Sequence, residues 1–400
     1  MDKGQRTKDK GYTIITAIAR TLLGLTFIFS GFVKAVDPLG TTYKIEDYLS
    51  AFAEYGGALA PLFENALVLA QVAAFALIAF EFTLGVMLVC NLWQRVSAWI
   101  TLIFMCCVTP LTLWIALSNP VSDCGCFGDA LVLTNWQTFW KNIVLLALVI
   151  GILVLRHKTP DTKHNYWTQG LIAGGAALAV VLFMVWTLYH LPIIDFRPYK
   201  VGNNIPELME IPEDAEVDQY DIRLVYADEN GVEQEFTLDN YPKDSTWHFV
   251  RQNSKLIKQG YVPPIHDFEL MNMDYEDITW DILESEIPVT LVVMYDLDKA
   301  DTKQAEKVSQ LYLQCIRNQE PFYILTGASD ARIEEFCYQV EQEYNTKDGR
   351  ASNRLTPFNH WEGVFCTADP VMLKTIVRAN PGVFVVQNGN VIDKYNLRNH

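Results

Sequence analysis

Asp123-Cys124-Gly125-Cys126-Phe127-Gly128-Asp129 is a short polar loop that carries two cysteines one glycine apart. It lies between two apolar runs, 96–117 and 136–155, and each is long enough to cross a bilayer, which takes about 20 residues of helix. Glycine lets the backbone turn sharply, so the two sulfurs can meet, and the ring that they would close is strained. Strained, exposed disulfides are the labile ones, so the loop indicates redox chemistry at a membrane surface.

Apolar runs of this length recur elsewhere in the first half of the chain. Half of the 400 residues are hydrophobic and 12% are aromatic, which is high for a soluble protein. The five runs are 12–33, 66–90, 96–117, 136–155 and 170–190, and none follows Leu191. We therefore expect a membrane α-helical bundle of five transmembrane helices followed by a soluble α/β domain.

The charge divides at the same place. Residues 1–190 hold 12 Lys and Arg against 11 Asp and Glu, whereas residues 191–400 hold 19 against 36, so the tail carries essentially the whole net charge of −16. An acidic tail argues against nucleic acid as a partner. Basic residues flank alternate ends of the runs: Lys3, Arg6, Lys8, Lys10, Arg95, Arg156, Lys158 and Lys163. By the positive-inside rule the N-terminus is cytoplasmic, and the cysteine loop and the tail lie on the outer face. The first run has no signal-peptide cleavage site and is expected to be retained.

Two charged residues are expected inside the bundle. Arg20 lies in the first run and Glu81 in the second, which runs in the opposite direction. A rise of about 1.5 Å per residue puts both at a similar depth, so we expect an Arg20–Glu81 pair. Such a pair either locks the bundle or takes part in its chemistry, and the sequence leaves both open.

Three interpretations compete for Cys124 and Cys126: a redox-active pair, a structural clip that fixes the loop, and a soft-metal site. Two thiolates alone do not complete a zinc shell, and no His neighbours them, so we predict no metal. The nearby Asp123 and Asp129 are expected to raise the thiol pKa unless Lys34 or Lys141 approaches the loop.

Residues 12–156 resemble the DoxX/MauE-type family of redox-associated four-helix membrane proteins. The resemblance rests on Arg20, Gly24, Gly31-Phe32-Val33-Lys34, Asp37-Pro38, Glu81, Gly85 and Cys124-Gly125-Cys126-Phe127-Gly128. It implies a bacterial inner-membrane protein. In that family the MauE-like branch, which the loop resembles more closely, is associated with maturation of a disulfide-rich periplasmic dehydrogenase. The DoxX-like branch is associated with quinone-linked sulfur oxidation, so the resemblance implies quinone as a candidate cofactor. Methylamine metabolism does not follow from the resemblance.

The acidic tail is expected to contain two parts. Residues 191–262 comprise a proline-punctuated linker, a β-hairpin around Asp228-Glu229-Asn230-Gly231 and a short helix near 246–259. Residues 263–400 resemble a thioredoxin-like domain, in which Asn380 and Pro381 occupy the cis-proline position beside a client groove. Where such domains carry Cys-x-x-Cys, this chain has Asp296-Leu297-Asp298-Lys299-Ala300-Asp301. The tail itself is therefore not expected to exchange disulfides.

The expected organisation is 1–11 cytoplasmic segment, 12–156 four-helix domain, 157–190 loop and fifth helix, 191–262 linker region and 263–400 thioredoxin-like domain. We expect Cys124 and Cys126 to carry thiol/disulfide exchange with periplasmic client proteins, supported by Arg20, Lys34, Glu81, Asp123 and Asp129. Whether the protein is an enzyme, as a thiol-disulfide oxidoreductase or a quinone-linked redox partner, stays open.

The alternative function is that of a non-catalytic, membrane-anchored assembly factor whose redox-inactive tail binds the client. Transport through five helices is the weakest reading. The expected partners are the lipid bilayer, a thiol-containing client and a quinone.

Overall fold

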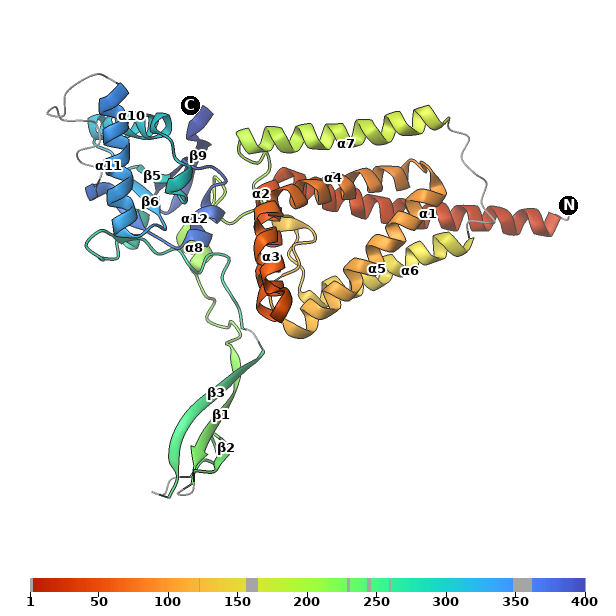
Figure 1. The fold of residues 1–400 in the computed structure, drawn as a ribbon, viewed down its shortest axis with the longest axis horizontal. Helices are drawn as coiled ribbons and strands as arrows, with labels where there is room; N and C mark the ends of the chain where they lie inside the picture. The colour runs from red at the N-terminus through yellow and green to blue at the C-terminus, as the bar shows by residue number, and fades with distance from the viewer. Residues whose placement is uncertain are drawn as a thin grey trace.

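The structure, a computed structural model, describes residues 3–121, 123–155, 165–228, 231–242, 246–258, 260–347 and 362–399. Arg156, Lys158 and Lys163, which helped to set the expected orientation, lie outside these ranges, as do Glu229 and Asn230 of the expected hairpin turn. A helical bundle, a projecting three-stranded sheet and an α/β domain follow one another (Figure 1).

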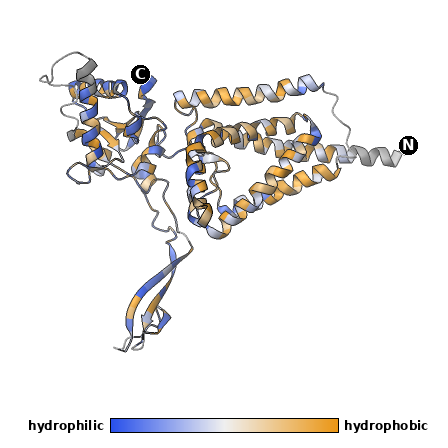
Figure 2. Cartoon of the chain, in the orientation of Figure 1, coloured by the Kyte–Doolittle hydropathy of each residue, from blue (hydrophilic) through white to orange (hydrophobic). Residues whose placement is uncertain are grey.

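Among the described residues, five helical segments are long and apolar enough to cross a membrane: Gly11–Val36, Gly57–Val89, Gln94–Ser118, Asn135–Leu155 and Tyr166–Tyr189. Figure 2 shows that apolar residues dominate them, whereas polar residues are interspersed throughout the tail. Large apolar side chains such as Val72, Ile103 and Leu171 point outward and are exposed, as suits a surface that faces lipid. The chain is therefore a multi-pass membrane protein, and the five expected spans are confirmed.

The bundle consists of α1 (Lys3–Val36), α4 (Ala70–Val89), α5 (Gln94–Ser118), α6 (Asn135–Leu155) and α7 (Tyr166–Tyr189). Helix α1 packs along α4, α5 packs along α6, and α7 lies against α4 and α1. Glycines allow the closest approach: a Cβ on Gly31 would lie 2.7 Å from the backbone nitrogen of Phe82. This contact fixes the register of α1 against α4.

One helix of the bundle region was not predicted. Helix α2 (Pro38–Tyr55) runs across the end of the bundle that faces the tail, and η1 (Gly57–Leu59), α3 (Ala60–Ala66) and η2 (Leu67–Leu69) lead from it into α4 (Figure 1). Asp37 caps α2 by accepting a hydrogen bond from the amide of Gly40, and Pro38 occupies the first turn. Helix α2 therefore lies beside the loop between α5 and α6.

The projecting sheet has the strand order β2-β1-β3 and is antiparallel throughout, with β1 (Gln219–Ala227), β2 (Glu233–Thr237) and β3 (His248–Lys258). The expected β1–β2 hairpin is confirmed. The expected helix near 246–259 is wrong, because His248–Lys258 pairs with β1 along nearly its whole length. A long pairing partner outweighs the weak local preference of this segment for helix.

The α/β domain contains a six-stranded sheet of order β4-β7-β6-β5-β8-β9. Strands β5, β6 and β7 are parallel, whereas β4, β8 and β9 each run antiparallel to their neighbour. The strands are β4 (Met271–Asn272), β5 (Val289–Val293), β6 (Phe322–Thr326), β7 (Phe365–Thr367), β8 (Gly382–Gln387) and β9 (Asn390–Asn396). The helices are α8 (Ile205–Met209), α9 (Thr279–Leu283), α10 (Thr302–Asn318), α11 (Asp330–Lys347) and α12 (Pro370–Ile376). Short turns are η5 (Leu297–Lys299), η6 (Glu362–Val364) and η7 (Leu397–Asn399), whereas η3 (Gly128–Ala130) lies in the bundle, between α5 and α6.

Both faces of this sheet are covered. Leu291 and Val293 of β5 join a core with residues of α9 and α12, whereas Val292 belongs to a second core with residues of α10 and α11. Successive residues of a strand point to opposite faces, which explains why all of β5 is buried. The fold class expected from the sequence, a membrane bundle with a separate α/β domain, is confirmed.

Candidate functional site

The Cys124–Cys126 loop lies between the end of α5 and the start of α6. Gly125 has φ of +63°, a conformation that favours glycine, and the turn brings the two sulfurs to 3.0 Å. Both residues are free thiols, and one donates a hydrogen bond to the other. The sequence prediction that the two sulfurs can meet is therefore realised in the geometry of the loop.

Three polar contacts hold the loop against the helices around it, and a fourth lies within the loop. Tyr48 of α2 donates to the carbonyl oxygen of Cys124 at 2.7 Å, and Lys44 of α2 lies 2.8 Å from Asp123. Asp123 also accepts from the amide of Gly125 at 2.7 Å, and Ser30 of α1 lies 2.7 Å from the carbonyl oxygen of Cys126. The loop is thus positioned from both α1 and α2.

The two thiols differ in acidity. The hydrogen bond from Cys124 lowers the pKa of Cys126 to about 6, against the effect of burial, and the charges of Lys141 and Lys34 lower it further. The same hydrogen bond, together with burial, raises the pKa of Cys124. Asp123 was expected to raise the thiol pKa unless Lys34 or Lys141 approaches the loop. Both lysines do approach it, and Lys44 pairs with Asp123, so the pKa of Cys126 is lowered. These effects favour the thiolate form of Cys126 over that of Cys124.

Glu81 pairs with Lys34 and not with Arg20, so the expected Arg20–Glu81 pair is wrong. Lys34 Nζ donates to both carboxylate oxygens of Glu81, at 2.9 and 2.8 Å. Helix α1 extends well beyond the end of α4, and the Gly31–Phe82 contact puts Glu81 beside Ser30 and Lys34. Arg20 lies ten residues before Ser30 in α1, which is about 15 Å along the helix axis. Its Nε has no hydrogen-bond partner among the described residues.

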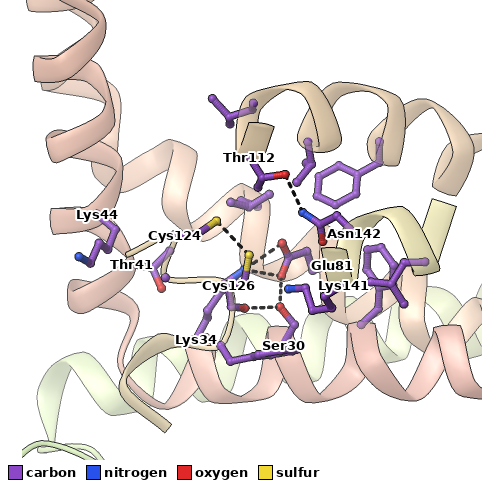
Figure 3. Close-up of a pocket in the computed structure, with 18 of the residues that line it drawn as sticks. Ser30, Lys34, Thr41, Lys44, Glu81, Thr112, Cys124, Cys126, Lys141 and Asn142 are labelled. Carbon is purple, nitrogen blue, oxygen red and sulfur yellow. Dashed lines mark hydrogen bonds and ion pairs between the residues drawn. The ribbon is translucent and has the colours of Figure 1, made fainter. Parts of the chain in front are cut away.

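A cavity of about 280 Å³ opens beneath the loop inside the bundle. Figure 3 shows Cys124, Cys126, Ser30, Lys34 and Glu81 gathered at one side of it and Thr112 and Asn142 at another. The apolar part of its wall comes from Phe27, Leu77, Phe104, Met105, Val108, Leu111, Phe127 and Leu145. Both cysteines line this cavity, so their chemistry is directed into the bundle.

Lys141 and Asn142 complete the polar part of the wall. Lys141 Nζ lies 4.4 Å from the ring centroid of Phe127, and Asn142 donates a hydrogen bond to Thr112 at 3.2 Å. Asn142, Tyr48 and Ser30 were not predicted as site residues. Ser30 could have been found, because it lies four residues before Lys34 and so shares its helix face.

The remaining predicted residues lie outside the cavity. Asp129 faces the tail, where Arg378 approaches it to 3.8 Å. Asn380 and Pro381 belong to the α/β domain; the peptide bond between them is cis, and Asn380 donates to the carbonyl oxygen of Asp296 at 2.6 Å. Neither residue lines the cysteine cavity. The structure thus brings together Cys124, Cys126, Lys34 and Glu81, with Asp123 at the edge.

The other six cysteines lie outside the loop. Cys90, Cys106 and Cys107 are exposed on the bundle, Cys315 and Cys366 are buried in the α/β domain, and Cys337 is half-buried there. Within the described ranges, no group of three or more His, Cys, Asp and Glu side chains could hold a metal ion.

The fold and the site define a multi-pass membrane protein that carries a paired-thiol loop at one end of its helical bundle. Residues 12–155 match the family model described as methylamine utilisation protein MauE, and this region, about a third of the chain, is a MauE-family domain. Residues 220–259 match a domain of unknown function, DUF8463, which corresponds to the three-stranded sheet. Neither the comparison with curated proteins nor that with solved structures finds a similar chain.

Proposed function

We propose that the protein carries out thiol/disulfide exchange through Cys124 and Cys126 and so supports the maturation of client proteins outside the cytoplasm. The observation that carries the proposal is the 3.0 Å separation of two sulfurs of different acidity above a cavity in the bundle. A structural clip needs neither a stabilised thiolate nor an open cavity beneath it. Low-pKa cysteines beside cations are the reactive ones.

The acidities assign a role to each sulfur. In the oxidised state, a client thiolate attacks Cys124 Sγ, the Cys124–Cys126 bond breaks, and Cys126 leaves as a thiolate stabilised by Lys141 and Lys34. A leaving thiol of lower pKa departs faster. A second client thiolate then attacks the client sulfur of the mixed disulfide, which releases the client disulfide and leaves Cys124 reduced. Two electrons have passed from the client to the pair, which is left with Cys124 as the thiol, after it takes up one proton, and Cys126 as the thiolate.

A quinone is the proposed acceptor that restores the disulfide. The cavity fits the head group of such a molecule, because an apolar wall faces hydrogen-bond donors at Lys34, Lys141 and Asn142, and its volume of about 280 Å³ is near the lower end of small-molecule sites. When bound, a quinone would supply a two-electron, two-proton acceptor beside the sulfurs. The chain's own residues would orient it and hold Cys126 as the thiolate.

The proposed orientation is that of a bacterial inner-membrane protein with a cytoplasmic N-terminus and a periplasmic loop and tail. The positive-inside rule supports it. The client is a periplasmic protein with cysteines, and the family name alone does not make it one of methylamine utilisation.

We propose that residues 263–400 are a thioredoxin-like domain that holds the client without exchanging disulfides. Support comes from the order of β5, α10, β6, α11, β8 and β9 with β8 antiparallel to β5. Support for a purely binding role is that Asp296–Asp301, at the end of β5, contains no thiol. The groove beside Asn380 and Pro381 would bind the client through backbone hydrogen bonds.

The second candidate is a non-catalytic assembly factor in which the cysteine pair is a clip. One observation favours it: the tail is seated directly on the bundle through Arg378 and Asp37, so it can act as an anchored binding module. The two candidates differ in whether the cysteine pair forms a bond to another protein.

Mixed-disulfide trapping separates them. With Cys126→Ser, the Cys124 thiolate can still exchange with a client disulfide, and no Cys126 is present to reverse the resulting mixed disulfide, so a reductant-sensitive conjugate should accumulate in cells. Cys124→Ser is the matched control and should trap much less, because Cys126 is the leaving group and not the point of attack. Equal absence of conjugates from both variants, in cells where the protein is abundant, supports the clip.

A further inference from the structure

Lys34 lies in the wall between two cavities. Besides the cavity beneath the loop, a second cavity of about 480 Å³ lies between the loop and the tail and is lined by charged residues such as Asp37, Arg197 and Arg378. Four residues line both cavities: Lys34, Thr41, Lys44 and Gly125. Of these only Lys34 is buried, with 6% of its surface exposed. Contact with bulk water does not explain a lysine that is buried between two cavities, so its position indicates a functional role.

A line of hydrogen-bonding groups connects Lys34 with the cysteine loop. Glu81 accepts two hydrogen bonds from Lys34 Nζ, and Ser30 Oγ lies 2.9 Å from Glu81 Oε2 and 2.7 Å from the carbonyl oxygen of Cys126. The Ser30 hydroxyl has one proton and can donate it to only one of these acceptors at a time. Lys34 also interacts electrostatically with both thiols.

Oxidation of the reduced pair, in which Cys124 is the thiol and Cys126 the thiolate, releases two electrons and one proton. A two-electron, two-proton acceptor in an apolar cavity must take its protons from the polar side chains that line it. Three lysines line this cavity, Lys34, Lys44 and Lys141, of which only Lys34 is buried, and Glu81 is its carboxylate. Lys44 pairs with Asp123. Lys141 is directed to the ring of Phe127, whereas Lys34 is held beneath the loop by Glu81.

We propose that Lys34, held in place by Glu81, carries the protons of thiol oxidation from the loop into the cavity within the bundle. Lys34 Nζ donates a proton to the acceptor and then takes one from Cys124 as its thiol is lost, and the ion pair is restored. The second proton that the acceptor takes up reaches Lys34 from water in the charged cavity between the loop and the tail, which Lys34 also lines. The inference rests on the proposed function and adds a proton-transfer residue to it.

The competing explanation is that Lys34–Glu81 only locks α1 to α4. Arginine separates the two explanations, because a guanidinium keeps the charge and pairs with a carboxylate through two hydrogen bonds but does not deprotonate in proteins. Lys34→Arg therefore preserves a lock and abolishes a proton path. Replacing both partners by leucine removes the lock without leaving a buried unpaired charge.

The test uses the full-length protein in lipid vesicles with the cysteine pair reduced. Oxidation of the pair is followed with a short-chain ubiquinone analogue and, separately, with glutathione disulfide, over about pH 5 to 9. Lys34→Arg should slow oxidation by the quinone about a hundredfold, the scale of general acid–base catalysis, and flatten its pH profile. Oxidation by glutathione disulfide, which needs no proton in the cavity, should change less than about twofold. The pH profile is read against the other groups that face the pair: Tyr48, Lys44, Asp123 and Lys141.

Glu54→Gln, an exposed carboxylate of α2, is the matched control and should leave both rates unchanged. If Lys34→Arg does not fold, the Lys34→Leu/Glu81→Leu double variant should show the same selective loss. If either folded variant is oxidised by the quinone at the wild-type rate, the proton path alone is overturned. If the wild-type protein reacts with glutathione disulfide but not with the quinone, both the proton path and the quinone acceptor are overturned. If the wild-type protein reacts with neither oxidant, the proposed function itself is overturned.

Discussion

The guanidinium of Arg378, in the tail, lies 2.8 Å from the carboxylate of Asp37, at the junction of α1 and α2. Arg378 also stacks 5.2 Å from the ring centroid of Tyr43, and Lys374 lies 4.8 Å from the same ring. Burial opposes charge at Asp37, but Arg378 and Arg197 hold the pKa of that carboxyl below its usual value. The tail is thus docked through a largely buried ion pair next to the cysteine loop.

Removing Arg378 should undock the tail. Breaking a buried pair leaves an uncompensated charge and costs about 3–5 kcal/mol, and we expect about 2 kcal/mol here because Asp37 keeps some exposure. Arg378→Ala should therefore speed proteolysis of the 191–204 segment several-fold. Arg251→Ala, which removes a pair with Glu233 exposed to solvent, should have little effect. Equal proteolysis of the two variants would show that the pair does not hold the tail.

The docking contact should also weaken in acid. Because the pKa of Asp37 is lowered in the folded protein, its contribution to stability is complete above the usual carboxyl pKa of about 3.9. It is lost as the pH falls through the lower, folded-state value. Hydrogen exchange of α12 should stay slow down to about pH 4 in the wild type. Protection that is lost near neutral pH would contradict the assigned pair.

Close packing of α1 on α4 predicts a clear steric effect. A Cβ on Gly31 would meet the backbone of Phe82, so Gly31→Ala should destabilise the bundle by about 1–3 kcal/mol. Gly174 of α7 has nothing within 4 Å of such a Cβ, and Gly174→Ala should be neutral or stabilising by up to about 1 kcal/mol. Thermal unfolding in detergent compares the two, and similar melting temperatures would exclude the observed helix contact.

The acidity of Cys126 predicts how the reduced pair reacts with alkylating agents. The alkylation rate of Cys126, measured in protein that retains Cys124, should reach half of its plateau value near pH 6. The alkylation rate of an ordinary thiol reaches half of its plateau near pH 8.5. Lys141→Met removes one of the cations that lower the pKa, so the midpoint should move upward; Lys200→Met, on the tail surface, should not move it. The thiolate's contribution to stability is present above about pH 8.5 and is lost as the pH falls through about 6.

The sequence predicts the spans because apolar runs of about 20 residues have few alternatives to crossing a bilayer. It does not predict α2, whose 18 residues are amphipathic and fall below a span in length and hydropathy. Arg20 and Glu81 share a depth only if α1 ends level with α4, whereas Gly24 already packs against the last turn of α4. Contacts such as Gly31–Phe82 set the true offset, and no local pattern in either helix encodes it.

The sequence predicts the part of the site that is local in the chain, and it does not predict the part that depends on helix packing. Cys124 and Cys126 are adjacent in sequence, so their meeting needs only a glycine turn. Lys34, Glu81 and Lys141 come from three different helices, and their position beneath the loop depends on how those helices pack. Residues 248–258 form a strand because β1 lies beside them, which the segment itself does not reveal.

The redox state of Cys124 and Cys126 in membranes tests the central claim most directly. Free thiols are alkylated with a mass tag before and after a pulse of reductant and during recovery, in the wild type and in the Cys124→Ser and Cys126→Ser variants. We predict that the wild-type pair is reduced by the pulse, returns to the oxidised state, and slows its return when quinone is depleted. A pair that stays in one state under every condition, or serine variants whose clients mature normally, would contradict the account.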